Sequence, residues 1–159
     1  MAQGLNRDRD ETGRPRNARP RDALGRPLAR GAAGLPPEDA AALAPADALR
    51  EAQHLIDAGN AFAAHEVLEA VWKSTAGPER ALWRGLAQLA VGLTHRARGN
   101  AVGAQALLQR GAETLASVGG TPWGVPVPAL RDWAYAAAVT PELSGPMPRI
   151  ADQAAEDRA

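Results

Sequence analysis

The tripeptide Gly-Asn-Ala occurs twice in this chain, at residues 59–61 and again 40 residues later at residues 99–101. Each copy separates two stretches in which apolar residues recur every three or four positions, which is the spacing of one face of an α-helix. Glycine followed by asparagine is typical of a helix end and the turn after it. A repeat of this length occurs in helical solenoids, but two copies are too few to stabilise one. The repeat therefore predicts two hairpins of antiparallel helices within a small bundle.

The apolar periodicity and its breaks predict five helices in all. The first runs from Asp47, its expected N-cap, to Ala58. The others are predicted at residues 61–73, 79–98, 101–118 and 129–139. No stretch alternates between apolar and polar residues at period two, which argues against a sheet. The fold class that follows is an all-α, compact bundle of about five helices in antiparallel pairs, with a disordered basic N-terminal arm.

Three regions differ in composition. We expect a disordered Arg/Pro-rich arm over residues 1–44, a helical bundle domain over residues 45–140 and a flexible C-terminal tail over residues 141–159. The first 31 residues hold eight Arg and four acidic residues, although the chain as a whole has no net charge. A segment of this kind has too few apolar side chains to form a core. In the tail, Pro146 and Pro148 prevent a long helix.

The composition also excludes several classes of protein. The chain has no cysteine, so it cannot form disulfides or thiolate metal sites, and it suits a reducing cytoplasm. No apolar run approaches the roughly 20 residues that span a bilayer. The N-terminus has no apolar core of a secretory signal. We therefore expect a cytoplasmic protein that does not enter a membrane.

The second predicted helix contains an unusual group of polar residues. At helical spacing, His65, Glu69 and Trp72 fall on one side, with Glu66 next to them. A histidine at position 69 would complete the helical zinc signature, but glutamate stands there. A metal ion held by His65 and Glu69 would need a third ligand, and His95 is the candidate. The structural alternative is that His65 hydrogen-bonds Glu69 or a group on a facing helix.

The third predicted helix carries Gly85 and Gly92, one heptad apart. Glycine in a helix interior costs about 1 kcal/mol relative to alanine, so a close neighbour is expected on this side. If the helix over residues 61–73 crosses there, Gln88 and His95 would face its polar edge. The candidate functional cluster is therefore made up of His65, Glu66, Glu69, Trp72, Gln88 and His95.

These patterns resemble a small bacterial and archaeal family, catalogued as a domain of unknown function, number three hundred and nine. The resemblance rests on His-Glu-x-x-Glu-x-x-Trp over residues 65–72, on the Gly85/Gln88 step and on the Gly-Asn turn. It covers residues 47–118, and more weakly residues 125–130. It implies an all-helical bundle that usually stands alone in the cytosol, and no particular activity or cofactor. The recurring polar positions of the family correspond here to His65, Glu66, Glu69, Gln88 and His95.

Two functions centre on the bundle. The first is a non-enzymatic module that binds a protein partner or forms a homo-oligomer, with Trp83 or Trp123 as an exposed anchor and with no cofactor. The alternative is a hydrolase or transferase that depends on a metal or small ligand and uses the cluster of His65, Glu66, Glu69 and His95. We favour the first, because no complete catalytic set can be assembled, and leave enzyme activity open.

A further alternative is weak nucleic-acid binding through the N-terminal arm. The basic residues that would contact phosphates are Arg14, Arg16, Arg19 and Arg21. The arm has no aromatic residue on which bases could stack, and its acidic residues reduce the positive field. Nucleic acid is therefore the less favoured partner.

Overall fold

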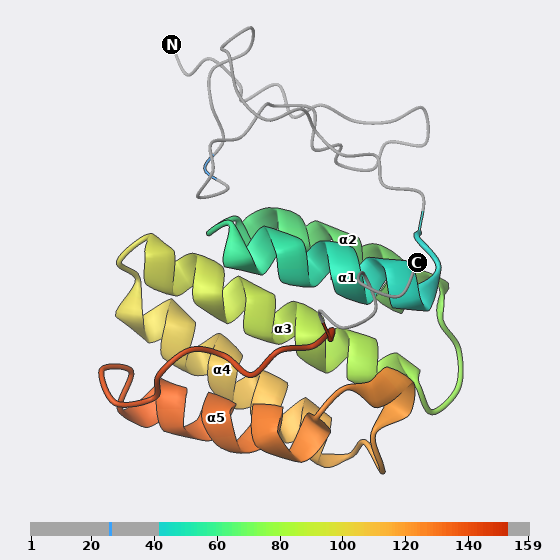
Figure 1. The fold of residues 1–159 in the computed structure, drawn as a ribbon. Coiled ribbons are helices and arrows are strands. Elements are labelled where there is room, and N and C mark those ends of the chain that lie inside the picture. Colours follow the sequence, from blue (N-terminus) through green and yellow to red (C-terminus); the bar gives the residue numbers. More distant parts are fainter. Residues whose placement is uncertain (1–25, 27–41, 153–159) are drawn as a thin grey trace, which may run out of the picture.

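A computed structural model describes residues 42–152 of the chain, together with Arg26. Its helices are α1 (Pro45–Asp57), α2 (Ala61–Ser74), α3 (Arg80–Ala97), α4 (Ala101–Ala116) and α5 (Val127–Val139), with a short 3-10 helix, η1 (Pro122–Gly124), before α5 (Figure 1). No strand occurs among residues 42–152. The predicted all-α bundle of five helices is confirmed. The basic arm, with Arg14, Arg16, Arg19 and Arg21, lies outside the described residues.

The helices pack in chain order. Helix α1 packs on α2, α2 on α3, α3 on α4 and α4 on α5, so that α1 and α5 are the two ends of the series. Because α1–α2 and α3–α4 are each joined by only three residues, each pair forms a hairpin, as the repeat predicts. None of the described helices is both long and apolar enough to cross a membrane.

The two Gly-Asn turns have the same geometry. Gly59 and Gly99 have φ angles of +77° and +75°, a left-handed conformation in which glycine avoids the clash of a side chain. Asn60 and Asn100 are the N-caps of the helices that follow. Each side-chain oxygen accepts a hydrogen bond from the backbone N–H three residues later, at 3.2 and 3.0 Å respectively. The sequence repeat is thus a structural repeat.

The start of α1 differs from the prediction. Its N-cap is Ala44, which makes no side-chain capping hydrogen bond. Asp47 lies in the first turn of the helix and pairs with Arg50 one turn later. A carboxylate in the first turn still interacts favourably with the helix dipole, so the residue supports the helix without capping it.

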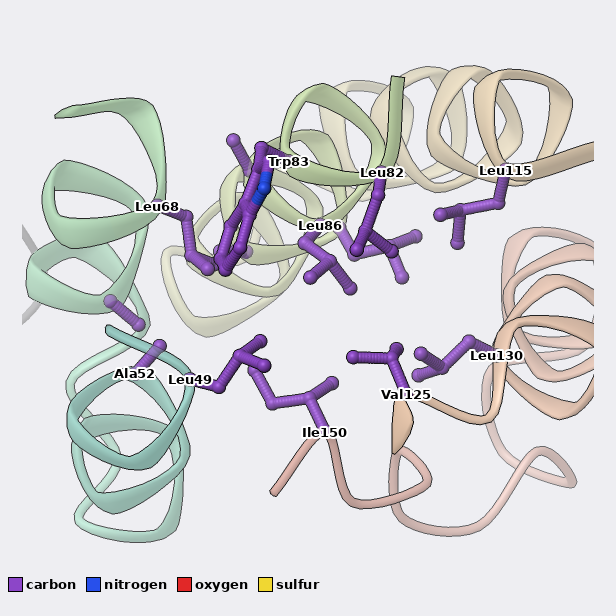
Figure 2. Packing of buried hydrophobic residues seen from close by; sticks show 14 of the residues in the cluster. Leu49, Ala52, Leu68, Leu82, Trp83, Leu86, Leu115, Val125, Leu130 and Ile150 are labelled. Atoms are coloured by element: carbon purple, nitrogen blue, oxygen red, sulfur yellow. The ribbon is translucent and has the colours of Figure 1, made fainter. Parts of the chain in front are cut away.

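The core is formed by leucines, valines and alanines, and its largest fully buried side chain is that of a tryptophan. Trp83 has no exposed surface and lies near Leu68 and Leu86 (Figure 2). The prediction that Trp83 could be an exposed anchor is therefore wrong, because α3 turns this indole toward the interior. Trp123, in contrast, is 50% exposed.

Helix α3 presents its glycines to α4. A side-chain carbon added at Gly85 would lie 2.7 Å from Leu115, and one at Gly92 would lie 2.8 Å from Leu108. On the facing helix, a carbon added at Gly111 would lie 2.5 Å from Leu89. The close neighbour predicted from these glycines exists, but it is α4. The expectation that α2 crosses there is wrong, because leucines of α4 occupy the space beside Gly85 and Gly92.

The packed domain extends beyond the predicted boundary at residue 140. Residues 141–152, which we call the C-terminal segment, run back from α5 toward α1 (Figure 1). Ile150 is 2% exposed, and its N–H donates a 2.7 Å hydrogen bond to the side-chain oxygen of the buried Gln53. Figure 2 shows Ile150 between Leu49 and Val125. This part of the expected flexible tail therefore completes the core.

Candidate functional site

The polar cluster of α2 centres on His65. Its Nε2 lies 3.3 Å from Oε2 of Glu69, and its Nδ1 lies 3.6 Å from Oε1 of Glu66. The other oxygen of Glu69, Oε1, pairs with the ammonium of Lys73 at 2.9 Å. The side chains of His65, Glu66 and Glu69 are between 20% and 28% exposed, so the group is half-buried but open to solvent.

Helical geometry brings these residues together. Glu69, four positions after His65, lies on the same edge of α2, and Glu66, one position after it, is one turn before Glu69 and reaches the ring from the side. Phe62, one turn earlier, covers the imidazole from the N-terminal side, with ring centroids 5.9 Å apart. The guanidinium of Arg98, which follows α3, lies 6.0 Å from the centre of the Phe62 ring. The imidazole is thus partly shielded on one side.

Trp72 lies at the other end of α2 and faces arginines of α3. The guanidinium groups of Arg80 and Arg84 lie 5.0 and 5.9 Å from its ring centre, which is cation–π distance. Arg80 also donates hydrogen bonds to the carbonyl oxygens of Trp72 and Thr75, at 2.9 and 3.0 Å. These contacts tie the end of α2 to the start of α3, which is a structural role.

Gln88 and His95 do not join the cluster. The Oε1 of Gln88 accepts a 2.7 Å hydrogen bond from the hydroxyl of Thr114, on α4. The Nδ1 of His95 lies 3.1 Å from the amide nitrogen of Asn100, at the α3–α4 turn. The predicted convergence of both residues on the edge of α2 is therefore wrong, because they lie on the side of α3 that α4 occupies.

Among the described residues, one group offers three potential metal ligands close together. It consists of His65, Glu66 and Glu69, with one ligand atom from each within 4.8 Å of the others. His95, the expected third ligand, is not a member, and Glu66 takes its place. Sequence reasoning also missed Lys73, although its position four residues after Glu69 is the spacing of a helical ion pair.

The fold and this polar edge define the class of protein, an all-α helical bundle domain. A sequence model of the family described as Domain of unknown function (DUF309) matches residues 49–107. This stretch of the chain, which includes both Gly-Asn turns and the cluster of α2, is therefore similar to that family. No curated protein and no solved structure matches the chain.

Proposed function

We propose that this chain is a non-enzymatic helical module that associates with a second copy of itself through the outer face of α5. The observation that carries the proposal is a row of exposed apolar side chains. Tyr135 and Val139 are 40% and 75% exposed and stand four residues apart on α5, and Leu143, in the turn that follows, is 84% exposed. Apolar side chains in a row favour burial against another surface.

The opposite end of the helix series has a different surface. Apart from Ala46, the exposed residues of α1 are charged or polar, and they are Asp47, Arg50, Glu51, His54 and Asp57. Of the two end helices, α5 therefore has the outer face whose burial against another surface is energetically favourable.

A second copy of the chain suits this face. A two-fold axis pairs the same apolar row with itself, so each copy covers the other. The row is short compared with stable interfaces, which bury about 1,200–2,000 Å². The proposed association is accordingly weak and depends on concentration.

The placement of the other polar residues supports a non-enzymatic role. Gln88 and His95, which would have supplied further functional groups beside His65, are engaged with Thr114 and Asn100. Nucleic-acid binding through the arm concerns residues outside the described range, and it stays a prediction from the sequence, as does the cytoplasmic location.

Sedimentation velocity over a range of concentrations tests the proposal. The wild-type chain is expected to shift from monomer toward dimer as its concentration rises. The double variant Val139→Glu/Leu143→Glu is expected to stay monomeric, because it places two charges on each copy of the proposed interface. Val102→Glu is the matched control, since Val102 is 80% exposed on α4 and lies outside the row.

Two outcomes would overturn the proposal. One is a wild-type chain that stays monomeric at every concentration. The other is association that persists unchanged in the double variant. Circular dichroism of each variant checks that the helices are intact.

A further inference from the structure

The indole of Trp123 is presented at the surface by a strained turn. Trp123 has φ and ψ angles of 57° and 19°, and no other residue except glycine has a positive φ in the described part of the chain. Bulky side chains rarely adopt this conformation. Backbone hydrogen bonds from Gly124 to Thr121 and from Val125 to Pro122, at 3.0 and 3.1 Å, fix the turn. Strain of this kind persists where the surroundings enforce it, and such residues cluster at ligand-contact sites.

The carboxylate of Glu79 orients this indole instead of capping its own helix. Glu79 is the N-cap residue of α3 but makes no side-chain capping hydrogen bond. Its Oε2 accepts a 3.1 Å hydrogen bond from Nε1 of Trp123. The neighbouring Arg80 donates its hydrogen bonds to carbonyl oxygens at the end of α2. Within the described residues, no cation pairs with Glu79 and none lies over the Trp123 ring. An exposed indole and a carboxylate without a counter-ion therefore lie side by side.

This pair of side chains fits a cationic group. The face of a tryptophan ring attracts a guanidinium or an ammonium. A carboxylate beside the ring can form a charge-assisted hydrogen bond with the same cation. Arginine suits such a site better than lysine, because its planar guanidinium stacks on aromatic rings. Proline-rich segments also dock on exposed aromatic side chains. The site therefore favours a segment in which arginine stands next to proline.

The chain contains such a segment in its own N-terminal arm. The tripeptide Arg-Pro-Arg occurs at residues 14–16 and again at residues 19–21. A residue that precedes proline favours an extended backbone, so each tripeptide presents its side chains with little loss of conformational freedom. The charges are also complementary. The first 31 residues have an excess of basic residues, and because the whole chain is neutral, the remaining residues have the opposite excess.

The arm is long enough to reach the site. The described part begins at Ala42, shortly before α1. Figure 1 shows the start of α1, the start of α3 and the turn before α5 at the same end of the bundle. The 20 residues between Arg21 and Ala42 can span up to about 70 Å. The longest helix, with 18 residues, measures only about 27 Å. Because the arm is tethered, even a weak contact is populated.

From these observations we propose that the Arg-Pro-Arg repeats of the N-terminal arm dock on Trp123 and Glu79 of the same chain. A guanidinium of the repeat stacks on the indole and pairs with the carboxylate, while the proline ring covers the exposed edge of the ring. The proposal does not depend on self-association, because Val139 and Leu143 lie beyond the other end of α5. Either proposal can fail without the other.

Paramagnetic NMR of the full chain tests the docking. The chain has no cysteine, so a nitroxide attached through Asn17→Cys stands between the two repeats and nowhere else. The indole N–H signal of Trp123, identified by its loss in Trp123→Phe, is compared between the oxidised and the reduced label. The signal is expected to lose most of its height with the oxidised label. The measurement is made at a concentration where sedimentation shows a monomer.

Two changes in the labelled chain separate the contributions of the site and the arm. Glu79→Gln keeps a hydrogen-bond acceptor for the indole but removes the charge, and it is expected to restore most of the lost height. Glu51→Gln is the matched control, because it removes an exposed carboxylate of α1 and should restore nothing. Replacing the four arginines of the repeats by serine should restore the signal fully, and these are Arg14, Arg16, Arg19 and Arg21.

Three results would overturn the proposal. The first is a Trp123 signal that the oxidised label does not broaden. The second is equal broadening in the wild-type background and in Glu79→Gln, or equal recovery in Glu79→Gln and Glu51→Gln. The third comes from mixing the isotope-labelled chain without nitroxide with the nitroxide-bearing chain at natural isotope abundance. Broadening of the same strength in this mixture would assign the contact to the arm of a second copy.

Discussion

The two helical hairpins share a turn but differ in the residues that line the contact between their helices. In α3–α4, glycines on both helices receive leucines of the other, at Gly85, Gly92 and Gly111. Neither α1 nor α2 contains a glycine. The two hairpins therefore share the turn, whereas only the second uses glycines to admit leucines of the facing helix.

The same comparison holds at the turns themselves. A side-chain carbon added at Gly103 would lie 2.5 Å from the side-chain nitrogen of Asn100 and 2.8 Å from the ring of His95. The corresponding positions in the first hairpin are Ala63 and Leu55, and there alanine fits. A larger residue at position 103, in the first turn of α4, would therefore displace the side chains of Asn100 and His95. His95 belongs to the architecture of this hairpin, which explains its absence from the cluster of α2.

The largest effect is expected from truncating the equivalent buried leucines. Leu68→Ala and Leu108→Ala should each lower the free energy of unfolding by about 2–5 kcal/mol, the range for such core changes. The loss for Leu108→Ala should lie at the upper end of this range. Leu108 packs against the backbone of α3 at Gly92, and a helix backbone cannot move in to fill the cavity that the shorter side chain leaves. Urea denaturation measures both values. A larger loss of stability in Leu68→Ala than in Leu108→Ala would contradict the proposed difference between the two hairpins.

A smaller effect is expected at the N-caps. Asn60→Ala and Asn100→Ala should each lower the free energy of unfolding by about 1 kcal/mol, because a capping hydrogen bond is lost. Asn100→Ala should cost more, since the amide of Asn100 also contacts Nδ1 of His95. Thermal denaturation of both variants, with Asn100→Asp as a cap-retaining control, measures the difference. Equal losses would mean that the contact with His95 adds nothing.

The smallest effect is expected when the cluster of α2 is replaced by the residues of α4. The triple variant His65→Gln/Glu66→Ala/Glu69→Gln should change the free energy of unfolding by less than about 1 kcal/mol, because half-exposed ion pairs contribute little. Urea denaturation in the presence of a chelator measures this change. A loss of several kcal/mol would show instead that the cluster holds the bundle together.

Much of the fold could be predicted because helices leave local signals. The predicted ranges of the second, third and fourth helices lie within about two residues of α2, α3 and α4, since apolar periodicity and glycine endings are visible in the sequence. The sequence also showed that Gly85 and Gly92 lie on one side of the third helix. It did not show which helix packs against that side, because periodicity defines the faces of a helix but does not assign a partner to each.

The candidate site was predictable only within one helix. The proximity of His65, Glu66 and Glu69 follows from helical spacing, and the structure brings these three together. The places of Gln88 and His95 depend on the packing of α3 against α4, which no local pattern encodes. The C-terminal segment was missed for a related reason. Its prolines exclude a helix, and a single apolar residue such as Ile150 has no periodicity.

The hydrogen bond between Ile150 and Gln53 joins positions 97 residues apart. During synthesis, Ile150 leaves the ribosome after all five helices. Until then, Leu49 and Val125 stay without the isoleucine that lies between them in the finished fold (Figure 2). The last step of burial therefore waits until residue 150 has been synthesised, and a nascent chain cut at residue 140 would keep an apolar opening that chaperones or proteases can recognise.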